Sequence, residues 1–263
     1  MACRGDWRSD SLPFVASYDA IGSTYATTRR PDPRIAAQLE RAIGTGSVIN
    51  VGAGAGSYEP VATVLAVEPS AVMIDQRPPG AAPCVQGAAE RLPAANNAFD
   101  VALGVLTIHH WSDVEQGLRE MERVARRIVL LTWDVAVASQ FWLLRDYLPE
   151  SIPYEAARFP AVDWLAARLN GTVETVPIPH DCTDGFAGAF WRHSGAYLDP
   201  AVRAGMSNFA HLGDAAASAL GRLSTDLEGG EWERRYQDIL GLGDFDIGYR
   251  IVASRSAGRR FSN

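Results

Sequence analysis

The chain contains no lysine, and all 24 of its basic side chains are arginine, an absence that reflects codon usage rather than function. Positive charge is in the minority, because 31 acidic residues outweigh those arginines and give a net charge of −7. A surface with this balance repels a phosphate backbone on average, and the sequence has no sustained basic patch. We therefore expect no nucleic-acid partner.

Cysteine is scarce, and Cys3, Cys84 and Cys182 form an odd set without CxxC spacing. This pattern argues against disulfides and structural zinc, and we expect no metal site. No apolar run reaches the roughly eighteen residues that a membrane span needs. Residues 1–10 lack the apolar core of a signal peptide. These absences together lead us to expect a cytoplasmic protein with no membrane partner.

The rest of the sequence is organised around the stretch SVINVGAGAGSYEPVATVLAVE, residues 47–68. It opens with apolar β-branched residues, which are typical of a buried parallel strand. Gly52, Gly54 and Gly56 follow, alternating with two alanines. Residues without a Cβ atom let the chain turn sharply and let a ligand lie against the backbone. This turn is therefore a candidate binding loop.

The residues after the glycine turn complete a nucleotide-binding pattern. We expect a short helix over residues 57–62 and a second strand from Thr63 to Val67 that leads into Glu68. An acid at the tip of the second strand is placed to accept hydrogen bonds from ribose hydroxyls. Because strand, loop, helix, strand and acid occur in this order, the stretch favours a nucleotide-like ligand over a simple turn.

The glycine spacing distinguishes between cofactors. The dinucleotide fingerprint G-x-G-x-x-G/A requires Gly or Ala at position 57, where this chain has Ser57. The G-x-G-x-G pattern instead resembles motif I of the class I S-adenosylmethionine-dependent methyltransferases. The family's usual acid two residues before the first glycine is Asn50 here. Asn50 can hydrogen-bond the loop or the ligand, but it brings no charge to meet the ligand's ammonium group.

A second segment, GAAERLPAANNAFDVALGVLTIHHW at residues 87–111, is similar to the family's next signature. The resemblance implies that the glycines and Glu68 hold the methionine and ribose, that Ala88 and Ala89 lie along the adenine, and that Leu106 offers backbone to the methionine amino group. Position 88 often carries Asp or Ser in the family. With alanine there, only a backbone N–H could recognise the adenine at that position.

The segment SYDAIGSTYATTRR before the core also resembles the family, many of whose members carry a Y-D-x-x-A/G-x-x-Y-x-x-x-R segment there. Tyr18 and Tyr25 are seven residues apart, which places them on one face of a helix. The resemblance implies that Tyr25 or Arg29 closes over the ligand's carboxylate. The alternative is an amphipathic lid helix with solvated arginines.

Proton removal from the acceptor has two candidate groups. His109 and His110 follow the strand expected over residues 99–106, and ligands of open α/β sheets bind outside the carboxyl ends of the strands. Either histidine could equally be a packed side chain. The second group lies further along the chain and comprises His180, Asp181, Asp184 and His193. The resemblance implies that Asp181 and Asp184 form one structural turn with Cys182 and Gly185, so we expect them first to be scaffold.

Local signals set the remaining elements. Asp32 and Pro33 begin a helix that Gly44 ends, and Ser112-Asp113 begin one that Arg126 and Arg127 end. Later elements are expected as a strand over residues 128–132, a helix over 159–170, and strands over 172–178 and 246–253.

The alternation of strands and helices predicts an α/β fold with a doubly wound, mostly parallel sheet. The resemblance makes this a seven-stranded, Rossmann-like methyltransferase fold with a helical cap insertion. The expected parts are an N-terminal lid and helices at 1–44, a cofactor-binding core at 45–133, the rest of the sheet at 134–178 and 244–256, and the cap over the substrate site at 179–243.

The resemblance implies methyl transfer from S-adenosylmethionine to a small-molecule acceptor, and the many aromatic residues of the cap suggest a largely apolar one in secondary metabolism. Two other functions stay open. The protein could bind the cofactor without transferring a methyl group, as a scaffold or in a cofactor-independent rearrangement, which Asn50 and Ala88 favour. A nicotinamide oxidoreductase is the second, disfavoured by Ser57. The oligomeric state cannot be deduced from the sequence.

Overall fold

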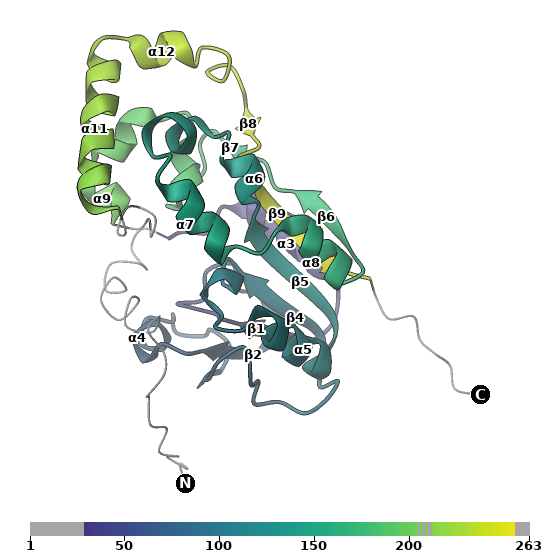
Figure 1. Cartoon of the computed structure of the whole chain (residues 1–263). Coiled ribbons are helices and arrows are strands. Elements are labelled where there is room, and N and C mark those ends of the chain that lie inside the picture. Colours follow the sequence, from purple (N-terminus) through teal and green to yellow (C-terminus); the bar gives the residue numbers. More distant parts are fainter. Residues whose placement is uncertain (1–28, 205, 207–208, 210–211, 256–263) are drawn as a thin grey trace.

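The structure, a computed structural model, describes residues 29–204, 206, 209 and 212–255, so Tyr18 and Tyr25 lie outside the described residues. Its main sheet has the strand order β3-β2-β1-β4-β5-β9-β6 (Figure 1). These strands are β1 Val48–Val51, β2 Thr63–Glu68, β3 Cys84–Gln86, β4 Phe99–Val105, β5 Ala125–Trp133, β6 Gly171–Thr175 and β9 Tyr249–Ser254. Strands β3, β2, β1, β4 and β5 pair in parallel, and β9 is antiparallel to β5 and β6. The predicted seven-stranded, mostly parallel sheet is confirmed.

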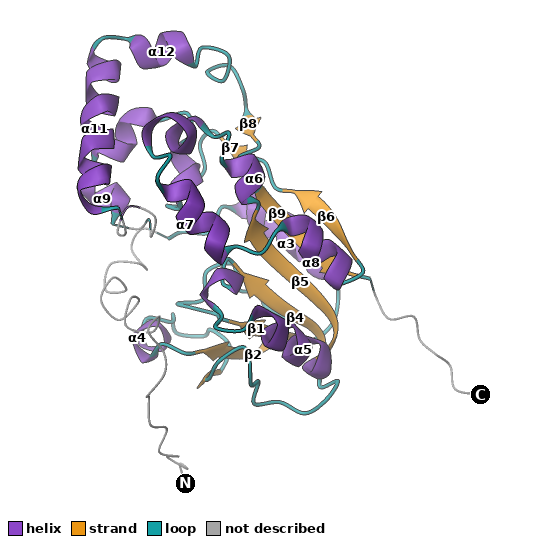
Figure 2. Cartoon of the chain, viewed as in Figure 1, coloured by secondary structure: helices purple, strands orange, loops and turns teal. Residues whose placement is uncertain are grey.

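Helices cover both faces of this sheet, as the orange strands and purple helices of Figure 2 show. The apolar side of α3 (Pro33–Ile43) packs in one buried cluster, together with Leu103 of β4. The apolar sides of α5 (Val114–Val124) and α8 (Val162–Arg168) pack in a second cluster, together with Ala102. Consecutive residues of β4 thus enter opposite clusters, because side chains alternate along a strand.

Two other connections are helical and short. Helix α4 (Ala71–Asp75) follows β2 and is capped by the Ser70 side chain, which accepts a hydrogen bond from the Met73 N–H. Helices α6 (Val135–Ala138) and α7 (Ser151–Arg158) lie between β5 and α8. In the described part of the chain, no helix combines the length and apolar composition that crossing a bilayer requires.

The helix expected over residues 57–62 does not form, and these residues make turns instead. Pro60 lacks an N–H to donate within a helix. Tyr58 has a left-handed φ of 58°, which a right-handed helix excludes. Its buried hydroxyl accepts a hydrogen bond from the Asp32 N–H at 3.1 Å, so tertiary packing holds it in place. The glycine loop therefore has no helix N-terminus after it.

Three further boundaries differ from those expected. Arg126 and Arg127 do not end a helix; they belong to β5, which pairs with β4 from its first residue. The helix expected over 159–170 begins only at Val162, after Pro160, because proline disfavours a helical conformation in the residue before it. The strand expected over 172–178 is divided: β6 joins the main sheet, and β7 (Ile178–Pro179) pairs with β8 (Asp244–Phe245) in a separate two-stranded sheet.

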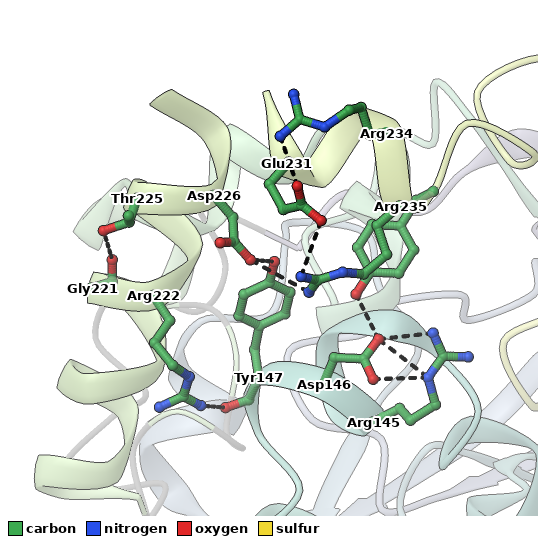
Figure 3. A network of polar contacts seen from close by, with 11 residues as sticks. Arg145, Asp146, Tyr147, Gly221, Arg222, Thr225, Asp226, Glu231, Arg234 and Arg235 are labelled. Carbon is green, nitrogen blue, oxygen red and sulfur yellow. Dashed lines mark hydrogen bonds and ion pairs between the residues drawn. The ribbon is translucent and has the colours of Figure 1, made fainter. Parts of the chain in front are cut away.

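The residues between β7 and β8 form the helical insertion, which lies at the upper left of Figure 1. The α-helices among its described residues are α9 (Pro200–Arg203), α11 (Gly213–Glu228) and α12 (Glu231–Arg235). Figure 3 shows how they meet the segment after α6: the Tyr147 hydroxyl donates to Asp226 at 2.6 Å, and Arg222 donates to the Tyr147 carbonyl at 2.7 Å. Partly buried polar contacts therefore hold the insertion against the segment that follows α6.

Candidate active site

A pocket opens at the carboxyl ends of β1, β2, β3 and β4, where ligands bind in open α/β sheets. Most of the predicted site residues line it, namely Arg29, Asn50, Gly52, Gly54, Glu68, Ala88, Ala89, Leu106 and His110. Gly56 and His109 are not among the lining residues. The structure thus brings together groups from four strand ends and from the start of the described chain.

The glycine loop crosses the end of β1 in a conformation that favours glycine. Gly52 and Gly54 have φ values of 68° and 52°, in the left-handed region. The N–H groups of Gly52 and Ala53 both donate to the Val67 carbonyl, which joins the loop to β2. A Cβ atom on Gly52 would lie 1.9 Å from Thr107 Oγ1, so this glycine is also needed for close packing.

Glu68 presents its carboxylate at the pocket from the last position of β2. Oε2 accepts a hydrogen bond from the Gly54 N–H at 2.8 Å, and Oε1 accepts one from the Ser70 N–H at 3.0 Å. The side chain is 7% exposed, and burial raises its pKa above the ordinary value although both N–H groups lower it. Each oxygen keeps a second lone pair, which a ribose hydroxyl could use.

Ala88 and Ala89 follow β3 and form an apolar part of the pocket, with Ala89 buried. The neighbouring Glu90 accepts hydrogen bonds from the backbone N–H groups of Ser112 and Asp113, at 2.7 and 3.1 Å. It joins the loop after β3 to the start of α5.

Leu106 turns the chain at the end of β4 with a left-handed φ of 48°. Its N–H donates to the Leu131 carbonyl at 2.8 Å. Only the carbonyl of Leu106 can therefore meet an ammonium group, which is a donor without acceptor capacity.

Arg29 reaches the pocket at the other side and is held by the insertion. Its guanidinium donates to both carboxylate oxygens of Asp184, at 2.7 and 3.2 Å. The Arg29 side chain is 8% exposed and that of Asp184 is fully buried. A fixed cation at the pocket wall suits a ligand carboxylate, and its partner is Asp184, a residue that the sequence assigned to a turn or to proton removal.

His109 lies behind the pocket wall. Its ring stacks on Phe159, with centroids 4.0 Å apart and planes inclined by 19°. Its Nδ1 is shielded from solvent and has no hydrogen-bond partner in the described part of the chain. Burial, with the nearby His110 and Arg158, lowers the pKa of His109 well below the ordinary value, so the ring stays neutral.

His110 lines the pocket, and Arg158 of α7 sets its tautomer. Arg158 Nη2 lies 3.2 Å from His110 Nδ1. A guanidinium can only donate, so Nδ1 must accept and the proton of the neutral ring must sit on Nε2. In this state His110 offers Nε2–H as a donor, whereas a general base would need an unprotonated nitrogen facing the acceptor.

The second candidate group does not assemble into one site. Asp181 pairs with Arg34 at 2.7 Å on the surface, and His180 Nδ1 lies 2.7 Å from Arg192. His193 Nε2 contacts the His180 carbonyl. Over the described ranges, no three His, Cys, Asp or Glu side chains gather as they would around a metal ion.

Sequence reasoning missed two contributors to the site. Arg158 acts on His110 from 48 residues away, and no local pattern marks it. Glu59 lies three residues after Gly56 and belongs to no motif that the sequence analysis used. Its carboxylate nevertheless accepts a hydrogen bond from Asn50. The sequence signal that could have drawn attention to Glu59 is Asn50 itself, which stands where the family usually has an acid.

Comparison with known proteins gives three findings, which cover very different shares of the chain. A family profile described as a methyltransferase domain matches residues 39–130. The solved structure of a protein from Anabaena variabilis ATCC 29413, described as a methyltransferase from an antibiotic biosynthesis pathway, is similar at 36% sequence identity and a TM-score of 0.78. The similarity covers 87% of this chain and 99% of that chain, so it extends well beyond the glycine loop.

A local similarity links the chain to the uncharacterized protein YafE of Escherichia coli (strain K12). The two are 49% identical over 41 residues, which is 16% of this chain and 20% of that protein. The chain thus spans only about a fifth of the length of this relative. This local match carries no argument about family or substrate.

Proposed function

The chain belongs to the class I S-adenosylmethionine-dependent methyltransferases, and we propose that it methylates a small, largely apolar organic molecule in secondary metabolism. S-adenosylmethionine is the cofactor of the family. The observation that carries the proposal is the glycine loop joined to Glu68 at the pocket, since the Gly54 N–H donates to that carboxylate at 2.8 Å.

The pocket residues fit this cofactor in chemistry. We assign the ribose hydroxyls to Glu68, the adenine to the apolar surface of Ala88 and Ala89, and the methionine carboxylate to Arg29. The methionine ammonium would meet the Leu106 carbonyl and Asn50. Asn50 Oδ1 is a buried acceptor without a partner in the described part of the chain, as a site for a donor-bearing ligand requires.

The chemical demand on the protein is modest. S-adenosylmethionine supplies a methyl group already activated on a sulfonium, so the chain must orient the acceptor and exclude water. His110 is proposed to donate Nε2–H to a polar atom of the acceptor and so orient it. The protein need not supply a base if the acceptor atom is already ionised. The same holds if the acceptor atom is uncharged but nucleophilic without first losing a proton.

The acceptor proposed here is largely apolar because the pocket near His110 includes Val105, Leu106 and Trp111. The Anabaena relative is described as part of an antibiotic biosynthesis pathway, which supports a role in secondary metabolism. The insertion at residues 179–243 is proposed to cover the substrate site. Its aromatic side chains Trp191 and Tyr197 are fully buried in the core, so they support the cap rather than line the pocket.

Calorimetric titration with S-adenosylmethionine and S-adenosylhomocysteine tests the cofactor site. Glu68→Ala is expected to weaken both by about tenfold or more, equivalent to about 1.4 kcal/mol, through the lost ribose contacts. Glu233→Ala, on an exposed position of α12, is the matched control and should bind like the wild type. Wild-type protein that bound neither ligand would contradict the proposed function.

The acceptor class is tested by product analysis with methyl-labelled cofactor. Incubation with extracts fractionated by size should place the label in a small, organic-soluble product. Label found only in RNA or protein would contradict the small-molecule proposal.

A further inference from the structure

A buried ion pair stands directly behind the glycine loop. Arg77 pairs with Glu59 at 2.6 Å, and their side chains are 5% and 8% exposed. Arg77 also donates to the Gly54 carbonyl at 3.4 Å, and the Ala82 N–H donates to Glu59 Oε1 at 3.1 Å. The pair thus fastens the loop at the place where the helix expected over residues 57–62 does not form.

Glu59 also fixes the orientation of Asn50. Asn50 Nδ2 donates to Glu59 Oε2 at 3.0 Å. A carboxylate can only accept, so the NH₂ end of the amide must face Glu59 and Oδ1 must point elsewhere. Asn50 lines the pocket and is 1% exposed, and its Oδ1 lacks a hydrogen-bond partner within the described ranges. A buried acceptor left unpaired costs stability, which indicates that a ligand supplies the donor.

We propose that Glu59 replaces the acid missing from position 50 by acting through Asn50, whose Oδ1 accepts a hydrogen bond from the α-ammonium group of the cofactor. This inference rests on the proposed function, because it requires S-adenosylmethionine in the pocket. Glu59 is a positioning residue here and does not touch the ligand. Its carboxylate orients and polarises the amide, and Arg77 holds the carboxylate in place.

The first test moves the carboxylate from one residue to the other. Asn50→Asp restores the family's usual acid but sets it against Glu59 across the present 3.0 Å contact, where two carboxylates repel. We expect it to bind S-adenosylhomocysteine at least about tenfold more weakly than the wild type. Adding Glu59→Gln leaves one carboxylate and one donating amide in exchanged positions, and affinity should return to within about threefold of the wild type.

The coupling between the two positions decides this test. Asn50→Asp, Glu59→Gln and the double variant form a double-mutant cycle with the wild type. If Asn50→Asp binds as tightly as the wild type, or if the second substitution recovers no affinity, the inference is overturned.

The second test isolates the ammonium contact. Asn50→Ala removes the acceptor and leaves the pair of Glu59 and Arg77 intact. This variant should bind S-adenosylhomocysteine about tenfold more weakly than the wild type does. Its affinity for the analogue in which hydrogen replaces the α-amino group should be unchanged. An equal loss for both ligands would mean that Asn50 serves only the shape of the loop, and would overturn the inference.

Methylthioadenosine, which lacks the amino-acid part, separates this inference from the proposed function. It should bind the wild type and the variants at positions 50 and 59 with equal affinity. Wild-type protein that binds neither S-adenosylhomocysteine nor methylthioadenosine overturns the proposed function itself. Wild-type binding with variants that bind equally well overturns only the role of Glu59. A variant with a lower melting temperature and unchanged affinity for S-adenosylhomocysteine also overturns it.

Discussion

At the scale of single residues, the histidine at the pocket is defined by the arginine behind it. His110 Nδ1 faces Arg158, so we predict that the neutral ring carries its proton on Nε2. Proton–nitrogen correlation spectra of histidine-labelled protein report the tautomer directly. Arg158→Gln should release this preference, since a neutral amide can either donate or accept.

A matched control for this prediction exists elsewhere in the chain. Arg192 lies 2.7 Å from His180 Nδ1, in the same kind of pair but away from the pocket. Arg192→Gln should shift the His180 signals and leave those of His110 unchanged. Finding the Nδ1–H tautomer at His110 in the wild type would restore it as a candidate general base.

A second residue-scale prediction concerns Gly52, where a side chain would meet both strain and a clash. Its φ is 68°, and a Cβ would lie 1.9 Å from Thr107 Oγ1. Gly80 has a φ of 87° but nothing within 4 Å of the added atom. Gly80→Ala should therefore cost only the backbone strain of about 1 kcal/mol, and Gly52→Ala clearly more. Urea denaturation measures both, and equal losses would show that Thr107 moves aside.

At the scale of elements, helix α3 depends on a buried cap that also holds the insertion. The Asp32 carboxylate accepts hydrogen bonds from the Arg34 side chain and backbone, and from the Thr183 N–H at 3.1 Å. Asp32 is fully buried. The side-chain hydrogen bond from Arg34 is the main cause that holds the pKa of Asp32 well below its ordinary value.

This lowered pKa predicts a pH-dependent effect of Asp32→Asn. A carboxyl group with a depressed pKa in the folded state stabilises the fold above its unfolded pKa of about 4, and this contribution is lost as the pH falls toward the folded value. At about pH 7 the variant should be less stable by about 1 kcal/mol or more in urea titrations, and the difference should shrink at about pH 3. A difference of constant size at both pH values would show that Asp32 acts only as a neutral cap.

The elements that the sequence predicted well are those with strong local signals. The β-branched run before Gly52 gave β1, and Asp32 with Pro33 gave the start of α3. The prediction of a helix over residues 57–62 was wrong because a hydrogen bond from the N–H of Asp32, 26 residues earlier, holds the Tyr58 hydroxyl. Such a contact cannot be deduced from local spacing.

The candidate site divides in the same way. Gly52, Gly54 and Glu68, which line the pocket, were predicted together because one short stretch carries them and the family motif gives their order. The roles of Glu59 and Arg158 depend on tertiary contacts, so they cannot be predicted from the spacing of residues in the sequence. Asp184 was noticed, but its pairing with Arg29 required the fold.

At the scale of the whole molecule, the insertion and one face of the sheet share a single buried cluster. It contains Leu103 and Val129 of the central strands as well as Trp142, Trp191 and Trp232. The centroids of the Trp142 and Trp232 rings lie 5.2 Å apart in an edge-on arrangement, which is favourable for aromatic pairs. Because the described residues of the insertion share this cluster with the sheet and form no buried cluster of their own, we expect the insertion and the sheet to unfold together.

Trp232→Ala tests this cooperativity. The side chain is 2% exposed, so its removal should cost about 3–5 kcal/mol and lower the melting temperature of the whole protein, not only of α11 and α12. Trp164→Ala on α8, where the side chain is 42% exposed, is the matched control and should cost much less. Far-ultraviolet circular dichroism and tryptophan fluorescence should give coincident transitions for both variants. A biphasic melt of Trp232→Ala, in which the sheet persists after the insertion has unfolded, would contradict this expectation. It would show that the insertion is an independent folding unit.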